Sequence, residues 1–313
     1  NEIYDLFPYE LDDFQKWCCY CIKNNYNTLT CAPTASGKTV PIVYAINNAL
    51  KKNKKVIICN PIKALSNQKF SDFQEIFGKD KIGLLTGDIK FQPSADCIIA
   101  TTEIIRSLMY KDTEYLKLDE IDTIIFDEFH MINDVSRGHV WEETLILSPS
   151  HINLVLLSAT INKPENIGLW LSKLKQKPLY LIEKHKRIVP LKYSYLLDEQ
   201  LIEFGNSDKE FKNYNIIKEK YKKINIKKLL NPTIDYLEKN NKLPCLFFLF
   251  SKKKCEEYAN IVTRNLLTSE ESANITNLFD KIVAPYKKIY EKTPQYNNLR
   301  RTIMKGVSYH HSG

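Results

Sequence analysis

The 313-residue sequence contains no apolar run that approaches the ~20 residues needed by a membrane-spanning helix. Its first residues also lack the basic start and short apolar stretch of a secretory signal peptide. These absences exclude a membrane-spanning or membrane-bound role from our expectations. Because the chain begins at Asn1 rather than methionine, we expect residues to have been trimmed from this end.

Zinc-binding patterns are also missing. Cys18 and Cys21 have the C-x-x-C spacing, but neither a second such pair nor paired histidines follow, so no structural zinc site is predicted. Four of the eight cysteines stand in or beside apolar runs, where a free thiol behaves as a small buried hydrophobe. These four are Cys31, Cys59, Cys97 and Cys245. We therefore expect reduced thiols and an intracellular compartment, cytoplasm or nucleus.

Arginine is scarce and supplies only six of the 45 basic residues. The formal net charge is nevertheless +8, which fits a polyanionic partner without requiring one, since surface lysines are common. With 43% hydrophobic and 26% charged residues, the composition is that of a globular protein. The length predicts about two domains.

The first half of the chain alternates short apolar runs with stretches of helical periodicity. The predicted strands are 28–31, 56–60, 83–85, 97–100, 123–126 and 154–158, and the predicted helices are 40–51, 62–77, 102–109 and 141–147. Buried strands that alternate with helices predict an α/β fold with a parallel sheet covered by helices on both faces. Ligands of such sheets bind at the carboxyl ends of the strands.

The second half is less regular. Residues 178–190 hold a run of charges and are interpreted as a connection, while the lysine-rich segment 209–228 is interpreted as a solvated insertion or helix face, with nucleic-acid contact as the alternative. A further strand and helix are predicted at 245–250 and 254–267, and another apolar strand at 307–309. Because this last strand ends the chain, we expect the second domain to be incomplete.

A phosphate-binding loop is predicted at 32–39, Ala-Pro-Thr-Ala-Ser-Gly-Lys-Thr, between the strand 28–31 and a helix. Backbone N–H groups and the positive end of the helix dipole converge on phosphates in such a loop. Lys38 would reach the β- and γ-phosphates, and Thr39 would offer its hydroxyl to Mg²⁺. Ala32 replaces the first glycine of the general pattern, and a plain strand-to-helix turn is the alternative. The predicted ATP contacts in the loop are Thr34, Ala35, Ser36, Gly37, Lys38 and Thr39.

Two acidic residues, Asp127 and Glu128, follow the predicted strand 123–126. Asp127 would hold Mg²⁺, usually through water, because this ion keeps much of its hydration shell. Glu128 would orient and deprotonate the attacking water. An acidic strand-to-loop turn is the alternative, and the presence of the phosphate loop in the same chain disfavours it. We therefore predict ATP and Mg²⁺ as cofactors, with Lys38, Asp127 and Glu128 catalytic and with Thr39 and Asp127 as metal ligands.

The sequence Asp127-Glu128-Phe129-His130 resembles the signature of superfamily-two DExH-box helicases, and further matches extend over nearly the whole chain. Each match is weak alone, but their order and spacing are specific. They comprise an adenine-contacting element at Phe14-Gln15, strand-contacting motifs at 61–65, 86–88 and 101–103, a coupling motif at 158–160, and second-domain motifs at 250–257 and 310–313.

The resemblance implies two RecA-like domains in tandem. Residues 1–185 would form the first, ATP-binding domain, and residues 186–313 the N-terminal part of a truncated second domain. The two would clamp a single RNA strand without sequence preference, and Gln15 would contact adenine. Residues assigned to nucleic acid are Pro61, Lys63, Thr86, Gly87, Thr101, Thr102, Glu103, Ser251 and His311. Ser158 and Thr160, joined by His130, would couple the ATP site to the strand.

Residues 134–143, Asp-Val-Ser-Arg-Gly-His-Val-Trp-Glu-Glu, resemble the exosome-cofactor branch of superkiller and antiviral RNA helicases. This resemblance implies an ATP-driven RNA translocase in RNA decay or processing, with exosome-like partners. Trp141 is expected only to be a buried anchor. A repair-type DNA helicase and a nucleotide-gated RNA-binding scaffold are the alternatives, and a small-molecule kinase would explain none of the motifs from Thr101 onward.

The family's later motifs, which supply arginines to the transferring phosphoryl group, find no match before Gly313. Arg300 and Arg301 do not stand in the matching position. We therefore expect the chain to be a fragment of a longer helicase that has little or no RNA-stimulated ATPase activity by itself.

Overall fold

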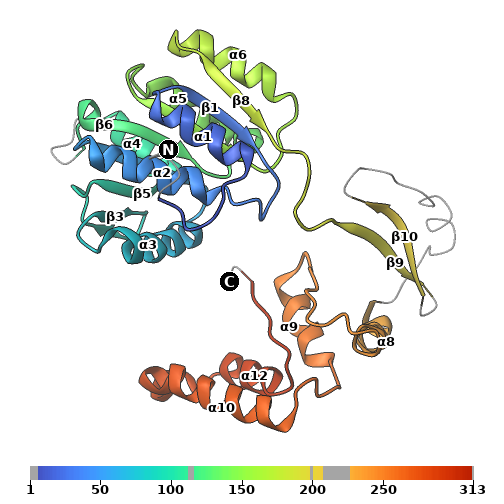
Figure 1. Cartoon of the computed structure of the whole chain (residues 1–313). Helices are drawn as coiled ribbons and strands as arrows, with labels where there is room; N and C mark the ends of the chain where they lie inside the picture. Colours follow the sequence, from blue (N-terminus) through green and yellow to red (C-terminus); the bar gives the residue numbers. More distant parts are fainter. Residues whose placement is uncertain (1–5, 112–115, 198–199, 207–225, 312–313) are drawn as a thin grey trace. The chain divides into compact units, whose positions relative to one another are not determined.

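The computed structural model describes residues 6–111, 116–197, 200–206 and 226–311. The chain divides into two compact units, residues 1–189 and 190–313 (Figure 1). Most of the lysine-rich segment 209–228 lies outside the described residues. Among the helices of the described part, none has the length and apolar character needed to cross a membrane.

The first unit is built around an eight-stranded sheet in the order β4-β3-β5-β2-β6-β7-β1-β8. All neighbouring strands are parallel except the edge pair β3–β4. The strands are β1 Asn27–Cys31, β2 Lys55–Asn60, β3 Ile82–Leu85, β4 Lys90–Phe91, β5 Cys97–Thr101, β6 Ile121–Phe126, β7 Asn153–Ser158 and β8 Leu179–Glu183. The six strands predicted from the sequence are therefore confirmed.

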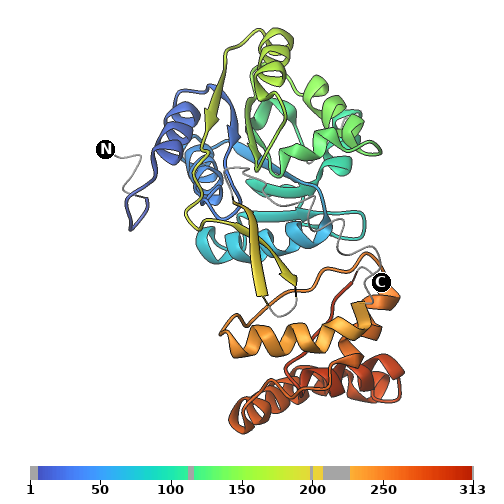
Figure 2. The same ribbon diagram turned by 90° about the vertical axis from the view of Figure 1, so that its right-hand side faces the viewer.

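Helices cover both faces of this sheet (Figure 1, Figure 2). They are α1 Asp13–Lys23, α2 Thr39–Lys51, α3 Lys63–Phe77, α4 Thr102–Met109, α5 Gly138–Leu147 and α6 Pro164–Lys175, with 3-10 turns η1 Leu118–Glu120 and η2 Phe129–Asn133. Alternate strand residues serve the two faces: Val56 and Ile58 of β2 pack with α1, α2 and α3, whereas Ile57 and Cys59 pack with α4, α5 and α6. This arrangement confirms the α/β class and the four helices predicted from the sequence.

Aromatic packing anchors the helical layer next to the acidic motif. Trp141 of α5 is fully buried, and its ring centroid lies 5.9 Å from that of Phe126 and 6.2 Å from that of Phe129. These contacts fix η2 against the end of β6. Trp141 is thus a core residue, as expected.

The interpretation of residues 178–190 as a connection is wrong for its first part. Leu179–Glu183 forms β8, which pairs in parallel with β1 at the edge of the sheet. An edge strand is covered less completely than a central one, and β8 is only partly buried. Its apolar pattern is accordingly weaker than those of the central strands.

The second unit begins with an antiparallel hairpin, β9 Lys192–Leu197 and β10 Gln200–Asn206. Helices follow: α8 Ile226–Lys239, α9 Lys252–Ile261, α10 Ser269–Val283, α11 Lys287–Tyr290 and α12 Pro294–Ile303, with the 3-10 turn η3 Ala284–Tyr286. A small core forms between α8 and α9 from Leu230, Ile234, Tyr258 and Val262. The helix predicted at 254–267 corresponds to α9, which ends earlier than expected, at Ile261.

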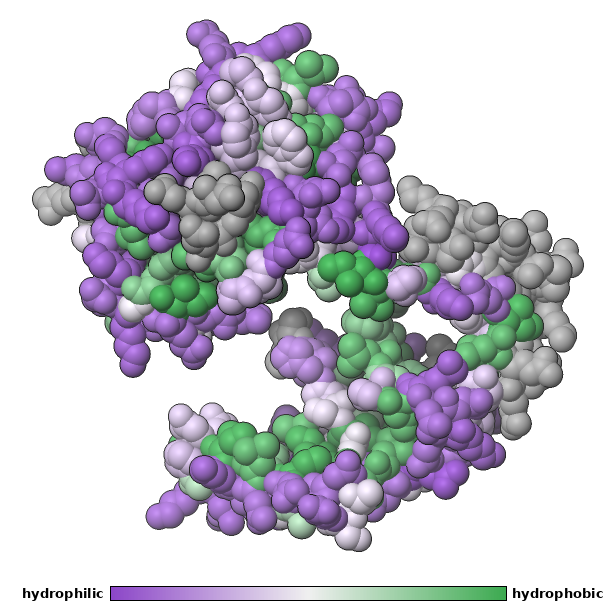
Figure 3. All heavy atoms as spheres, viewed as in Figure 1, coloured by the Kyte–Doolittle hydropathy of each residue, from purple (hydrophilic) through white to green (hydrophobic). Residues whose placement is uncertain are grey.

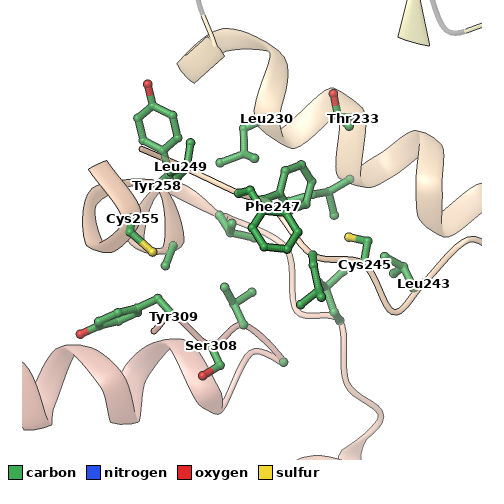
Figure 4. A pocket seen from close by; sticks show the side chains of 18 of the residues that line it. Leu230, Thr233, Leu243, Cys245, Phe247, Leu249, Cys255, Tyr258, Ser308 and Tyr309 are labelled. Atoms are coloured by element: carbon green, nitrogen blue, oxygen red, sulfur yellow. The ribbon is translucent and has the colours of Figure 1, made fainter. Parts of the chain in front are cut away.

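Residues 245–250 and 307–309, both predicted to be strands, form none. Both segments line an apolar cavity of about 600 Å³, where Phe247 and Leu249 lie toward Leu230 of α8 and Tyr258 of α9 (Figure 4). A strand needs a hydrogen-bonded neighbour, and no strand pairs with either segment in the described part of this unit. Leu246, Phe248 and Phe250 are exposed. Figure 3 shows a broad apolar area on this unit.

Candidate nucleotide and nucleic-acid site

The motifs of the first unit meet at one edge of the sheet. Asp127 and Glu128 follow β6, Ser158 ends β7, and the phosphate loop follows β1, so adjacent strands carry the predicted ATP motifs. The neighbouring strands β3, β5 and β2 precede the segments 86–87, 101–103 and 61–63, which were predicted to contact nucleic acid. Since the carboxyl ends of parallel strands lie at the same edge, both sets share that edge.

The phosphate loop has the backbone of an anion-binding turn. Ala35 and Gly37 have positive φ angles of 63° and 86°, which place successive N–H groups on the concave side of the loop. A Cβ at Gly37 would lie only 2.4 Å from the Gln15 Nε2 atom, so this close approach requires glycine. Thr39 is exposed at the first position of α2, where the helix dipole is positive.

Gln15 fixes the phosphate loop to α1. Its amide Nε2 donates to the carbonyl oxygen of Gly37 at 3.1 Å and to that of Ser36 at 3.4 Å, while its Oε1 accepts from the backbone N–H of Asp12 at 2.9 Å. The Asp12 side chain in turn accepts from the Gln15 N–H, which completes a capping box, and it also accepts from the Phe14 N–H. Gln15 is thus buried in a positioning role, and its predicted contact with adenine stays a prediction.

Lys38 lies over the loop that carries it. Its ammonium donates to the carbonyl oxygens of Ala32 at 2.8 Å and Pro33 at 3.1 Å. Burial lowers the pKa of Lys38, and the nearby charges of Glu128 and Asp127 partly restore it. An ammonium that is half-buried and held by carbonyl groups alone can exchange these neutral acceptors for phosphate oxygens.

Asp127 and Glu128 directly follow β6, and the backbone of Asp127 continues the hydrogen bonding between β6 and β2. The Asp127 N–H donates to the carbonyl oxygen of Cys59 at 3.0 Å, and the Asp127 carboxylate forms an ion pair with Lys69 of α3. Glu128 has the left-handed angles φ 52° and ψ 46°, which cost a non-glycine residue about 1–2 kcal/mol. This turn directs Glu128 away from the strand, and the Nδ1 atom of His130 lies 3.3 Å from its Oε2.

The donors at this site fit a magnesium ion held mainly by phosphates. Asp127 supplies a carboxylate and Thr39 a hydroxyl, both hard oxygen ligands. No group of three or more His, Cys, Asp or Glu side chains suited to a metal occurs in the described part of the chain. Mg²⁺ bound with nucleotide needs only one or two protein ligands, so the small donor set agrees with such a role.

The coupling motif touches the phosphate loop through its backbone. The carbonyl oxygen of Ser158 accepts from the Ala32 N–H at 3.0 Å, and the buried Ser158 hydroxyl has no hydrogen-bond partner within the described ranges. Thr160 is exposed two residues later. The structure thus brings Ser158 and His130 to the ATP motifs but leaves Thr160 at the surface.

Lys63 and Gly87, from two different motifs, lie together. The Lys63 ammonium is 3.4 Å from the position of a Cβ at Gly87 and pairs with the Asp88 carboxylate. Thr86 closes the turn, since its hydroxyl accepts from the Ile89 N–H at 3.2 Å. The exposed Lys63 ammonium is the basic group that this turn offers to a phosphate.

Arg137 was not singled out from the sequence, and it joins two of the predicted motifs. Its Nε donates to Glu103 Oε1 at 2.9 Å, and its Nη2 donates to the Pro61 carbonyl oxygen at 2.6 Å. Asp134 accepts from the Arg137 N–H at 2.9 Å and fixes the turn. The Glu103 carboxylate is therefore engaged by Arg137. The sequence showed the motif 134–143, but it did not show which residues Arg137 contacts.

The two threonines at the start of α4 are buried. Thr102 is fully buried with its hydroxyl 3.5 Å from the carbonyl oxygen of Asn60, and Thr101 is 7% exposed. The Thr102 hydroxyl therefore faces protein, whereas the first N–H groups of α4 form its positive end.

Ser251 and His311 belong to the second unit. The Ser251 hydroxyl accepts from the Lys254 N–H at 3.4 Å and caps α9. The His311 Nε2 atom lies 2.9 Å from Glu256 Oε1, and Ser312 and Gly313 of the same motif lie outside the described residues. Both predicted residues are thus placed at or beside α9.

The DEAD/DEAH box helicase family matches residues 12–167, the region that holds the phosphate loop, the acidic pair and the coupling motif. Residues 12–167 form a domain of this helicase family. The chain is 33% identical, over 98% of its length, to the antiviral helicase SKI2 of Saccharomyces cerevisiae and 34% identical, over 98%, to the exosome RNA helicase MTR4 of Homo sapiens. It spans 29% and 31% of these two proteins.

The helicase fold also appears in a solved structure. The crystal structure of the DUF1998 helicase MrfA superimposes with a TM-score of 0.58 and 17% identity over 91% of this chain and 42% of MrfA. This likeness supports the RecA-like fold of the DEAD/DEAH box helicases for the chain.

Proposed function

We propose that this chain is the ATP-binding part of an ATP-dependent RNA helicase that acts in RNA decay or processing. The observation that carries the proposal is the shared sheet edge, where the ATP motifs after β6, β7 and β1 adjoin the nucleic-acid motifs after β3, β5 and β2. Residues 1–185 would form the ATP-binding domain and residues 186–313 part of the second one.

The proposed ATP site divides the work among a few side chains. Lys38 leaves its two carbonyl acceptors for the β- and γ-phosphates, and Glu128 orients the attacking water and accepts its proton. Mg²⁺, when bound through Asp127 and Thr39, neutralises charge on the phosphate oxygens. His130, beside Glu128, and Ser158, beside the phosphate loop, would report the state of the nucleotide.

RNA would bind through its phosphates at the neighbouring strand ends. The Lys63 ammonium and the N–H groups at the start of α4 would contact the backbone of the strand, which fits recognition without sequence preference. Arg137 would hold the Pro61 and Glu103 segments in place for these contacts. The buried hydroxyl of Thr102 would contribute only to packing.

RNA is favoured over DNA as the substrate because relatives that align over nearly the whole chain are named as RNA helicases. One of them is named as an exosome helicase, so we infer an exosome-like partner and an intracellular location. A repair-type DNA helicase is the competing function. Comparing stimulation of ATP hydrolysis by single-stranded RNA and DNA in the full-length protein separates the two.

The Glu128→Gln variant of the full-length protein tests the proposed mechanism. It should bind a fluorescent ATP analogue with wild-type affinity but hydrolyse ATP about 10²–10⁴-fold more slowly, because the proton acceptor is lost. Lys38→Ala is the matched control and should lose binding itself. Unchanged turnover in Glu128→Gln would contradict the role given to Glu128.

A further inference from the structure

Lys69 forms a buried ion pair with the proposed magnesium ligand. Its ammonium contacts Asp127 Oδ2, and the two side chains are only 15% and 10% exposed. The sequence offered no sign of this contact, since 58 residues separate the partners. Lys69 therefore supplies a positive charge beside Asp127.

The helix that carries Lys69 begins in the nucleic-acid motif. α3 starts at Lys63, and six residues of helix span about 9 Å. Lys63 itself contacts Asp88 and lies against Gly87. One rigid helix thus connects the carboxylate of the ATP site with the turn proposed to bind RNA.

The Lys69 charge also reaches the phosphate-binding lysine. It is among the groups that lower the pKa of Lys38, although burial is the main cause. A divalent cation at Asp127 would add to the positive charge already present there. The Lys69 ammonium and a magnesium ion would both contact the Asp127 carboxylate and would repel each other there. The ion pair with Lys69 and the binding of Mg²⁺ therefore compete.

We propose that Lys69 is a positioning residue that acts as the resident counterion of Asp127 and releases it when magnesium nucleotide binds. This inference rests on the proposed ATP site. The ion pair ties α3 to the acidic motif, and α3 would be free of that tie once magnesium nucleotide takes the Asp127 carboxylate. Binding of magnesium nucleotide thereby changes the contacts of α3, the helix that carries Lys63.

The test is the magnesium dependence of nucleotide binding, measured by the fluorescence of mant-ADP at increasing Mg²⁺. In Lys69→Met the competing ammonium is gone, so the half-saturating Mg²⁺ concentration should fall by about tenfold relative to the wild type. Lys69→Arg keeps the charge and should stay near the wild-type value. Lys81→Met is the matched control, because Lys81 pairs with Asp96 at the surface away from the motifs.

A second measurement does not depend on nucleotide. Without Mg²⁺, Lys69→Met should unfold at a lower temperature than the wild type, because Asp127 is left buried without a counterion. Should Lys69→Met fail to fold, Lys69→Gln gives the same comparison.

The two proposals fail in different ways. Absence of mant-ADP binding in the wild type would refute the ATP site, whereas an unchanged Tm of Lys69→Met without Mg²⁺ would refute the counterion role of Lys69. An unchanged or raised magnesium requirement in the Lys69 variants, with mant-ADP bound normally, would overturn the counterion proposal alone.

Discussion

Single residues tie the proposed site together over long sequence distances. Arg137 reaches Glu103 and Pro61, which lie 34 and 76 residues away in the chain, and Lys69 reaches Asp127. Sequence patterns identified the phosphate loop and the acidic pair because each is a local motif beside a strand. They could not identify Arg137 or Lys69, since a charged side chain on a helix or turn gives no sign of its distant partner.

Arg137 offers a prediction at this scale. Arg137→Met should weaken RNA binding by about tenfold, because two charge-assisted contacts that position the Pro61 and Glu103 segments are lost. Arg137→Lys should recover only part of the affinity, since an ammonium lacks the planar fork that serves both acceptors. RNA anisotropy titrations of the full-length protein measure the change, and mant-ADP affinity should stay the same.

Arg106→Met is the matched control for Arg137. Arg106 pairs with Glu143 in the same unit, at 3.3 Å and with both side chains partly exposed. It should therefore change RNA affinity much less than Arg137→Met. Equal losses in the two variants would show that Arg137 contributes only general charge.

Among the elements, the sequence predicted the central strands well and the peripheral ones poorly. Central strands such as β2 and β5 are buried on both faces and show continuous apolar runs. β8 and α1 were not recognised. The buried face of α1 uses Cys18, Cys19 and Cys21, whereas Trp17 and Tyr20 are exposed, so its apolar periodicity is blurred.

The C-terminal end of α5 gives a prediction about pH. Lys175 of α6 is buried, and its ammonium donates to the carbonyl oxygens of Ser148 and Ile146. Burial lowers the pKa of Lys175 from 10.5 to about 8. Between these two values the folded chain has lost the proton and the unfolded chain keeps it. The free energy of unfolding therefore rises with pH across this window.

Comparison with Lys175→Met isolates this contribution. The wild type should gain up to about 3 kcal/mol relative to the variant between pH 7.5 and 10.5, because one pKa unit corresponds to about 1.4 kcal/mol. Urea unfolding of both proteins at several pH values measures the difference, and titration of other groups cancels in the comparison. A difference that stays constant over this range would disprove the assignment to Lys175.

At the scale of the whole molecule, the two units differ in how completely they bury apolar surface. The first unit has two extensive buried clusters, one on each side of its sheet, whereas the described residues of the second have a small core between α8 and α9. Residues 245–250 have the apolar composition of a strand, which the sequence revealed. The sequence could not show that the described part of this unit lacks a strand to pair with them.

The exposed face of residues 245–250 leads to a last prediction. Phe248 and Phe250 are 83% and 107% exposed in a segment that pairs with no strand of the described residues, which is a surface prone to association. The chain of residues 1–313 should therefore bind the dye ANS and self-associate. Replacing both phenylalanines by lysine should lower dye fluorescence and association about twofold or more, because charge on an exposed apolar edge disfavours association.

Sedimentation velocity measures the association. Leu169→Lys, at a 61% exposed position of α6, is the control and should leave both properties unchanged, and an equal effect there would refute the assignment to 245–250.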